Sequence, residues 1–251
     1  MRMKEDHMKN GQLKAAYNVQ LASASGFIIG ENISHNPSDM YTLKPFLTNL
    51  LDKYPNKLNK IVADAGYENE ENYVFLAEKG LDSYIKPSNY KKSKTRKYKK
   101  DMEFRKNLKY DEKQDKYTSP EGKEFIRCKD KHTKKKSGYI STTKIYRCFD
   151  WNTNGQKTKG IYISETFQKH REKSLKNIRP KEGIEERINR LIQTEGAFSK
   201  IKDGLSYNRF HHKGKANVIS EINLLSISLN LNKLASKITK KDLEIIKYKA
   251  A

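Results

Sequence analysis

Glu195 is a carboxylate in an unusual sequence position. It lies four residues after Leu191 and three before Phe198 within the run 182–202, and these spacings place the three side chains on one face of a helix. A carboxylate on a face that packs against a core is costly to desolvate unless a cation or hydrogen bonds meet it. Because Gly196 follows and leaves room for close approach, the pattern favours a ligand-binding acid. The alternative is a glutamate at the solvent edge of the stripe.

Asp64 is the second candidate acid. The apolar run 61–63 (IVA) precedes it and Gly66 follows, a pattern typical of a buried parallel strand that presents an acid at its carboxyl end. Open α/β sheets bind ligands at that edge, although Asp64 taken alone also suits an ordinary turn. Together with Glu195 it offers oxygen ligands of the kind that Mg²⁺ or Mn²⁺ prefers. Two such ions can activate an attacking oxygen and stabilise the leaving oxygen of a phosphodiester.

Basic residues accompany the acid on the helix. Lys202 lies seven residues after Glu195, close to two turns along the same face, where a cation would meet a phosphate beside the metal. Arg190 lies five residues before Glu195, a spacing that turns it well away in a regular α-helix, so it ranks below Lys202. Just beyond the helix comes a basic patch of Arg209, His211, His212 and Lys213. Adjacent histidines in a polar loop are predicted to face solvent rather than a metal.

The charge balance of the whole chain points to a polyanionic partner. There are 52 Lys and Arg against 30 Asp and Glu in 251 residues, a formal net charge of +22. Lysine and arginine that neutralise phosphates release condensed counterions, so such a surface attracts nucleic acid. The plain alternative is a soluble, lysine-rich protein from an AT-rich genome. An anionic membrane is a weaker candidate, because no basic amphipathic helix stands alone.

Several protein classes are disfavoured by simple features. Two cysteines, Cys128 and Cys148, are too few for a disulfide framework and lack the paired spacing of a zinc site. The polar first ten residues do not resemble a signal peptide, and no apolar run reaches the length of a membrane span. We therefore expect a cytoplasmic protein that has no membrane partner.

The elements that must position the two acids alternate between strands and helices. Residues 14–22 and 26–34 are predicted as strands joined by a Ser/Gly turn. They are followed by a helix at 41–53, a strand ending at Asp64, a helix at 69–79 closed by Gly80, and a strand at 81–85. This alternation indicates α/β architecture.

The middle and the end of the chain have different patterns. Residues 88–179 are rich in Lys and Tyr, with basic runs at 91–100 and 129–136. Such a segment either tracks a phosphate backbone and stacks on bases or is a solvated insertion without specific contacts; short strands are predicted within it at 139–146 and 160–164. The run 182–202 is predicted as a long helix with a core-facing apolar stripe (Ile184, Ile188, Leu191, Phe198), and 217–238 as a largely buried helix.

Three segments give the sequence a family resemblance. They are KNGQLKAAYNVQLA at 9–22, IVADAGYENEENY at 61–73 and EGAFSKIKDGLSYNRFHHKGKANV at 195–218. In this order, with a Lys- and Tyr-rich insertion between the second and third, they resemble the DDE transposases of bacterial insertion sequences, over about residues 1–237. The resemblance implies a ribonuclease-H-like fold, with the second catalytic acid at Asp64 and the third at Glu195.

The resemblance also implies chemistry and partners. Members of that family cleave and join DNA at element ends with a divalent metal, Mg²⁺ or Mn²⁺, and without a covalent enzyme intermediate. Lys202 and Arg209 match basic positions downstream of the glutamate. With Lys213 and Arg190 they form the set that we expect to bind DNA, and assembly as a homo-oligomer is compatible with the family.

The chain departs from the family pattern in three places. The first catalytic aspartate belongs to an early strand upstream of KNGQLKAAYN, and neither that motif nor an apolar strand precedes it here; Asp6 has no strand behind it. The insertion reads SPEG at Ser119–Gly122 where relatives often have a Cys-Pro-x-Gly stretch. Finally, Asn208 and Lys213 stand where arginines are expected.

The sequence therefore predicts an α/β, ribonuclease-H-like core that lacks its first strand, with a long Lys/Tyr-rich insertion before the last catalytic helix. The expected divisions are 1–87 and 181–238 for the core, 88–180 for the insertion and 239–251 for a tail. We expect a DNA-binding transposase fragment that does not catalyse alone. The rival interpretation is a non-catalytic, basic DNA-binding protein whose acids are structural.

Overall fold

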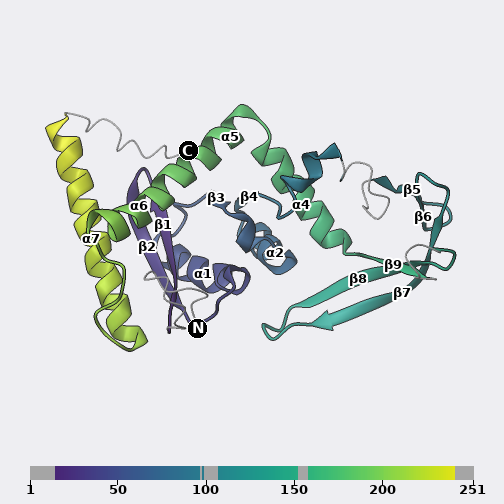
Figure 1. Cartoon of the computed structure of the whole chain (residues 1–251), viewed down its shortest axis with the longest axis horizontal. Coiled ribbons are helices and arrows are strands. Elements are labelled where there is room, and N and C mark those ends of the chain that lie inside the picture. Colours follow the sequence, from purple (N-terminus) through teal and green to yellow (C-terminus); the bar gives the residue numbers. More distant parts are fainter. Residues whose placement is uncertain (1–14, 97, 99–106, 152–157, 241–251) are drawn as a thin grey trace.

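The computed structural model describes residues 15–96, 98, 107–151 and 158–240. Asp6 and nearly all of the expected tail at 239–251 lie outside these residues. Figure 1 shows an elongated molecule in which the C-terminal helix stands at one end, a small α/β core occupies the middle and an antiparallel sheet forms the other end.

The first half of the core follows the sequence expectation closely. Strand β1 (Asn18–Ala24) and strand β2 (Phe27–Ser34) form an antiparallel hairpin. Its turn uses the left-handed region at Ser25 (φ 51°) and Gly26 (φ 82°), the conformation that a glycine accommodates without steric cost. Helix α1 (Leu43–Lys53) follows and buries one face (Leu43, Phe46, Leu47, Leu50). The predicted strands and helix are confirmed.

The next unit delivers Asp64. Strand β3 (Lys60–Ala63) pairs in parallel with strand β4 (Asp82–Ile85), and helix α2 (Glu70–Glu78) connects them. Asn69 caps α2 by accepting a hydrogen bond from the backbone N–H of Asn72, as N-cap asparagines commonly do. The parallel strand with an acid at its carboxyl end is thereby confirmed, but three of its four residues are only half-buried.

The two strand pairs are separate sheets in the described part of the chain. β1 pairs with β2, β3 pairs with β4, and no ladder joins β1 to β3. On the far side of β4 lies helix α4 (Glu165–Ile178), whose buried Ser174 hydroxyl bonds both the N–H and the carbonyl of Ile85. The β3–β4 pair is therefore covered at its β4 edge, and no ladder joins its β3 edge to the β1–β2 pair.

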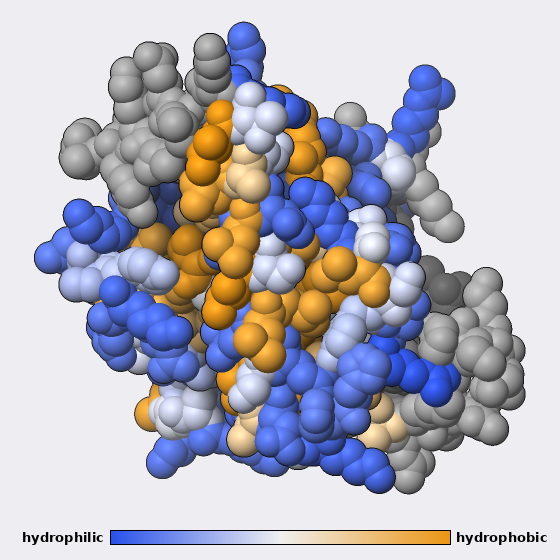
Figure 2. Space-filling view, turned by 90° about the vertical axis from the view of Figure 1, so that its left-hand side faces the viewer, coloured by the Kyte–Doolittle hydropathy of each residue, from blue (hydrophilic) through white to orange (hydrophobic). Residues whose placement is uncertain are grey.

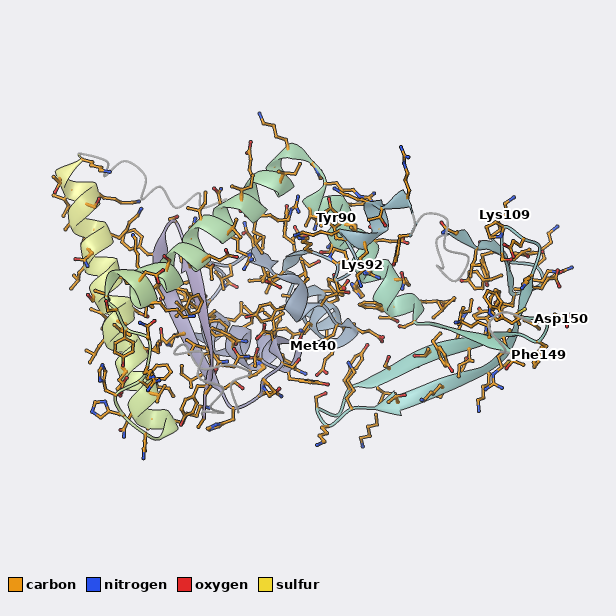
Figure 3. The ribbon with its side chains drawn as sticks, viewed as in Figure 1. Met40, Tyr90, Lys92, Lys109, Phe149 and Asp150 are labelled. Atoms are coloured by element: carbon orange, nitrogen blue, oxygen red, sulfur yellow. The ribbon has the colours of Figure 1, made fainter. Side chains whose placement is uncertain are left out.

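The middle of the chain forms a sheet of its own. Its five antiparallel strands follow chain order: β5 (Lys109–Asp111), β6 (Lys116–Thr118), β7 (Glu124–Lys134), β8 (Ile140–Cys148) and β9 (Lys159–Ile163). Phe125, Tyr146, Trp151 and Ile163 belong to a small apolar cluster that packs against this sheet. Lys109, Phe149 and Asp150 mark the end of this sheet that lies away from the core (Figure 3). Strands predicted at 139–146 and 160–164 are confirmed.

The long β7–β8 hairpin returns to the core. At its tip the Tyr139 hydroxyl donates to Glu70 at 2.7 Å and the Ser141 hydroxyl donates to the same carboxylate at 2.8 Å. Ser137 donates to Glu71 at 2.9 Å. Since Glu70 and Glu71 form the first turn of α2 and are buried, the hairpin tip is attached to the helix that follows Asp64.

The C-terminal part is one long helical run and one separate helix. Helix α5 (Lys181–Arg190) continues through a π-helical turn (Leu191–Glu195), helix α6 (Gly196–Ser199) and a second π-helical turn (Lys200–Gly204). Helix α7 (Lys215–Thr239) packs beside β2, where Asn230 exchanges hydrogen bonds with the backbone of Ile28. Both helical predictions are confirmed in position.

Two expectations about burial are wrong. The stripe of Ile184, Ile188 and Leu191 does not face the core, because these side chains are 41%, 49% and 47% exposed. A π turn contains one extra residue, so it moves the residues before and after it onto different faces. Phe198 therefore reaches the apolar cluster of Ile201 and Val218, whereas the earlier part of the stripe does not. Helix α7 is also not largely buried, since it covers β2 with one face only.

Candidate active site

Asp64 lies at the junction of β3 and a short 3₁₀ turn. Its carboxylate accepts a hydrogen bond of 2.7 Å from the backbone N–H of Gly66 and caps the turn Ala65–Tyr67. The side chain remains 53% exposed. The local fold therefore fixes the orientation of Asp64 and leaves part of the carboxylate available to a ligand.

Arg190 joins the two predicted acids. The same guanidinium nitrogen, Nη2, lies 3.8 Å from Asp64 Oδ2 and 3.9 Å from Glu195 Oε1. The expectation that Arg190 points away from Glu195 is wrong. Hydrogen bonds in a π-helix join residues five apart, so the π turn at Leu191–Glu195 brings these two side chains to one side. A regular α-helix would separate them.

Glu195 is not a core-facing carboxylate. Its side chain is 63% exposed. Glu195 therefore does not pay the desolvation cost that was expected of a carboxylate on a core-facing stripe. What gives Glu195 a place in the site is its position at the end of the π turn, opposite Asp64. The two acids, which are far apart in the sequence, face one guanidinium.

Asp39 is a third acid at this place, and the sequence reasoning missed it. Its Oδ1 accepts a hydrogen bond of 2.7 Å from the Asn18 amide. A Cβ built on Gly66 would lie 3.0 Å from Asp39 Oδ2 and 3.6 Å from Asp64 Oδ1, so the two carboxylates flank the same glycine. The only sequence signal was the Pro-Ser-Asp turn before α1, which is also an ordinary helix start.

Tyr67 reports the electrostatic character of this corner. Burial raises the pKa of its hydroxyl well above the ordinary value, the negative charges of Asp39 and Asp64 raise it further, and Arg190 opposes them.

The loop that carries Asp39 is held against α2, since the carbonyl of Met40 accepts hydrogen bonds from Asn69 and Asn72. Figure 3 places Met40 beside the core helices.

The acids border a cavity between the two strand pairs. Its volume is about 600 Å³, and its lining includes the apolar face of α1, Arg190 and Glu195. Every residue from Asn18 to Ser25 and from Lys57 to Asp64 also lines it. Successive side chains of a strand point to opposite faces, so a cavity lined by every residue of β1 and β3 must face their backbone edges.

The donor chemistry of the site suits a divalent metal in part. Mg²⁺ is usually held through one or two carboxylates, with waters and substrate phosphates completing its shell. Asp64 and Glu195 fit that role, with Arg190 as the cation now between them. Within the described residues no group of three His, Cys, Asp or Glu is arranged to hold a metal.

The remaining predicted DNA-binding residues lie outside the cavity lining. Lys202 is exposed on the second π turn, and Arg209 and Lys213 are exposed on the loop before α7. Glu221 fixes that loop, because its carboxylate accepts hydrogen bonds from the backbone N–H groups of His211 and His212. Both histidines are exposed, as expected.

Residues 118–235 match the family model described as "Transposase DDE domain". The match contains Glu195, Lys202, Arg209 and Lys213, and it begins after Asp64. The family resemblance seen in the sequence is confirmed over these residues. A search of curated proteins and a search of solved structures found no match. In the described part of the chain, no helix has the length and hydrophobicity that crossing a membrane requires.

Proposed function

Because residues 118–235 carry a transposase DDE domain, we propose that the chain is part of a DNA-processing protein of this kind, with a ribonuclease-H-like core whose catalytic centre is incomplete. Asp64 and Glu195 are its two carboxylates. The observation that carries the proposal is the single guanidinium that lies between them. It supports a common site for two acids that the sequence keeps 131 positions apart.

The proposed roles follow from the contacts. Asp64 is oriented by the Gly66 N–H, and Glu195 is presented by the π turn. Arg190 offsets part of their charge, and its planar guanidinium is suited to a phosphate oxygen pair. A divalent metal, when bound, would supply activation of a water and stabilisation of the leaving oxygen. Two carboxylates and one cation can position a phosphodiester. The aspartate that the family resemblance places on an early strand is not among the described residues of this site.

DNA binding is proposed to extend beyond the site. The β7–β8 hairpin exposes four lysines, Lys129, Lys131, Lys134 and Lys136. Phosphate contacts of this kind give affinity without sequence preference and weaken steeply with salt. The folded sheet favours a basic arm that contacts the DNA backbone over the alternative of an unstructured, solvated insertion.

A nicking assay tests the catalytic part. The full chain is incubated with supercoiled plasmid and with element-end DNA, in Mg²⁺ or Mn²⁺. We expect DNA binding and no metal-dependent nicking above background. Robust nicking that Asp64→Ala abolishes and Asp52→Ala retains would overturn the proposal that this chain does not catalyse alone. Asp52 is the matched control because it is an exposed carboxylate on α1.

The second candidate is a non-catalytic, basic DNA-binding protein whose acids are structural. It is favoured by the same observation, since the Arg190 guanidinium offsets part of the charge of both carboxylates without a metal. A Mg²⁺ titration separates the two: a surviving metal site requires both Asp64 and Glu195, so stabilisation by Mg²⁺ should disappear in either alanine variant. Equal stabilisation of all three chains would favour the structural interpretation.

A further inference from the structure

The cavity between β1 and β3 has the features of a strand-binding groove. We propose that it accepts an added extended peptide segment, which joins the pairs β1–β2 and β3–β4 into one continuous sheet. This goes beyond DNA processing, because it concerns a polypeptide ligand and can be measured without DNA. In the described residues, β1 and β3 each have a strand partner on one side only.

Backbone groups of both strands border the cavity. The cavity is lined by every consecutive residue of both strands, so it faces two rows of main-chain N–H and C=O groups. Unpaired strand edges are templates for pairing with another segment, and addition of a strand to such an edge is a common mode of peptide recognition. Here two edges face the same space.

The directions of the two edges are compatible with one occupant. Asn18, at the start of β1, bonds Asp39, and Asp39 flanks Gly66, just after the end of β3. The start of β1 and the end of β3 therefore lie at the same end of the cavity, which makes the strands antiparallel across it. A segment parallel to β3 is then antiparallel to β1, and both are ordinary ladders.

The walls define the chemistry of the segment. On one side lies the apolar face of α1, including Phe46, Leu47 and Leu50; on the other lie polar residues of the long helix, including Asn189 and Gln193. An occupant of ordinary strand length, about five or six residues, should alternate branched apolar side chains with small polar ones. Rows of main-chain N–H and C=O groups pair with a polypeptide backbone, so the occupant of the strand edges is a peptide rather than DNA.

The test is a binding measurement with a defined probe. A fluorescein-labelled peptide of alternating valine and threonine, with an amidated carboxyl end, is titrated with the full chain and followed by anisotropy. A second peptide carries proline at its central position, which removes a ladder hydrogen bond. We expect saturable binding of the first and at least tenfold weaker binding of the second.

Hydrogen exchange locates the peptide. On saturation, the amides of Asn18–Ala24 and Lys60–Ala63 should gain protection, while the hairpin β7–β8 should not change. Failure to bind, equal binding of the proline peptide, or protection confined to other strands would overturn the proposal. Each result is independent of the DNA-binding and nicking assays, so the proposed function and the groove can fail separately.

A second, independent inference concerns α7. Its outer face exposes apolar side chains at alternating steps of three and four: Leu224, Ile227, Leu231, Leu234 and Ile238, with exposures between 36% and 68%. Figure 2 shows apolar side chains gathered into a stripe along this end of the molecule. Apolar side chains at alternating steps of three and four form the seam of a coiled coil.

We infer that this seam pairs with the same helix of a second copy. The positions beside it are uncharged at Asn223, Ser228, Asn230 and Ala235. The flanking cation Lys237 is buried over the Phe27 ring. The chain has a net charge of +22, so two copies repel each other over most of their surface. A face without exposed flanking charges lets them approach without that local repulsion. Because the opposite face already packs beside β2, the helix is ordered before it pairs, which lowers the cost of association.

Sedimentation equilibrium tests the pairing. The full chain should be dimeric and Leu231→Asp monomeric, with unchanged circular dichroism. The matched control is Ile188→Asp, which places the same charge on the other exposed apolar stripe, 49% exposed, and should remain dimeric. A monomeric parent chain, or equal dissociation by both variants, would overturn the inference.

Discussion

Replacing Arg190 by methionine isolates the charge that holds the two acids together. The change keeps most of the apolar stem and removes the guanidinium. Both contacts are longer than the 2.7–2.9 Å of a charge-assisted hydrogen bond, at 3.8 Å and 3.9 Å. Partly exposed ion pairs contribute about 0.2–1 kcal/mol each, so we expect Arg190→Met to lower the free energy of unfolding by about 1 kcal/mol.

The decisive measurement is the response to Mg²⁺. Without the guanidinium, Asp64 and Glu195 face each other uncompensated, and a divalent ion can take the position of the missing charge. Urea unfolding with and without Mg²⁺ should show greater stabilisation of Arg190→Met than of the parent chain, because a ligand that binds only the folded state stabilises it. Lys200→Met, which removes an exposed cation of the same helical run, is the control.

Two results would refute this reasoning. A loss of about 3 kcal/mol or more that does not diminish in high salt would mean that Arg190 belongs to a buried network, since salt screens exposed pairs. Equal stabilisation of the parent, Arg190→Met and Lys200→Met by Mg²⁺ would mean that the metal binds elsewhere. The first result would refute the assignment of Arg190 to an exposed ion pair, and the second would mean that the two acids are not a metal-binding unit.

Three further predictions concern packing, pH and DNA. Gly183→Ala should destabilise the chain by about 1–3 kcal/mol in urea unfolding, because a Cβ there meets the backbone of α4 at Asn177 and at Ile178 Cα (2.8 Å); Gly196→Ala, which meets open space, should not. Burial raises the pKa of Tyr73 well above its ordinary 10.0, so its contribution to stability is present below pH 10.0 and is lost as the pH rises; the fall in melting temperature above that pH should be shallower in Tyr73→Phe. Arg209→Gln should weaken DNA binding across sequences and reduce the salt slope by about one, measured by anisotropy, and no change in the slope would remove Arg209 from the interface.

The regular elements could be predicted because their local signals agree. In residues 15–96 the period-two strands, the asparagine cap of α2 and the left-handed glycine at Gly80 all indicate the fold that is observed. Composition did not predict the five-stranded sheet in the insertion as a unit. Its strands are short or carry polar and charged side chains on most positions, and they are held by pairing between neighbours rather than by a large apolar core.

The site was only partly predictable for a different reason. Asp64 could be placed from its strand, but Arg190 and Glu195 meet through a π turn, and five-residue spacing has no signature in a pattern of period 3.6. Asp39 was missed because its contacts with Asn18 and Gly66 are tertiary. The exposure of α7 was also unpredictable, since an apolar helix sequence does not reveal which of its faces finds a partner.

The hairpin tip gives the basic sheet a third point of attachment. Two covalent connections alone would let the sheet swing, whereas Tyr139, Ser141 and Ser137 bind it to the first turn of α2. That turn begins six residues after Asp64. A load applied to the sheet by bound DNA would therefore reach the acid through a short, hydrogen-bonded path, and tilting of the sheet and movement of Asp64 should be mechanically coupled.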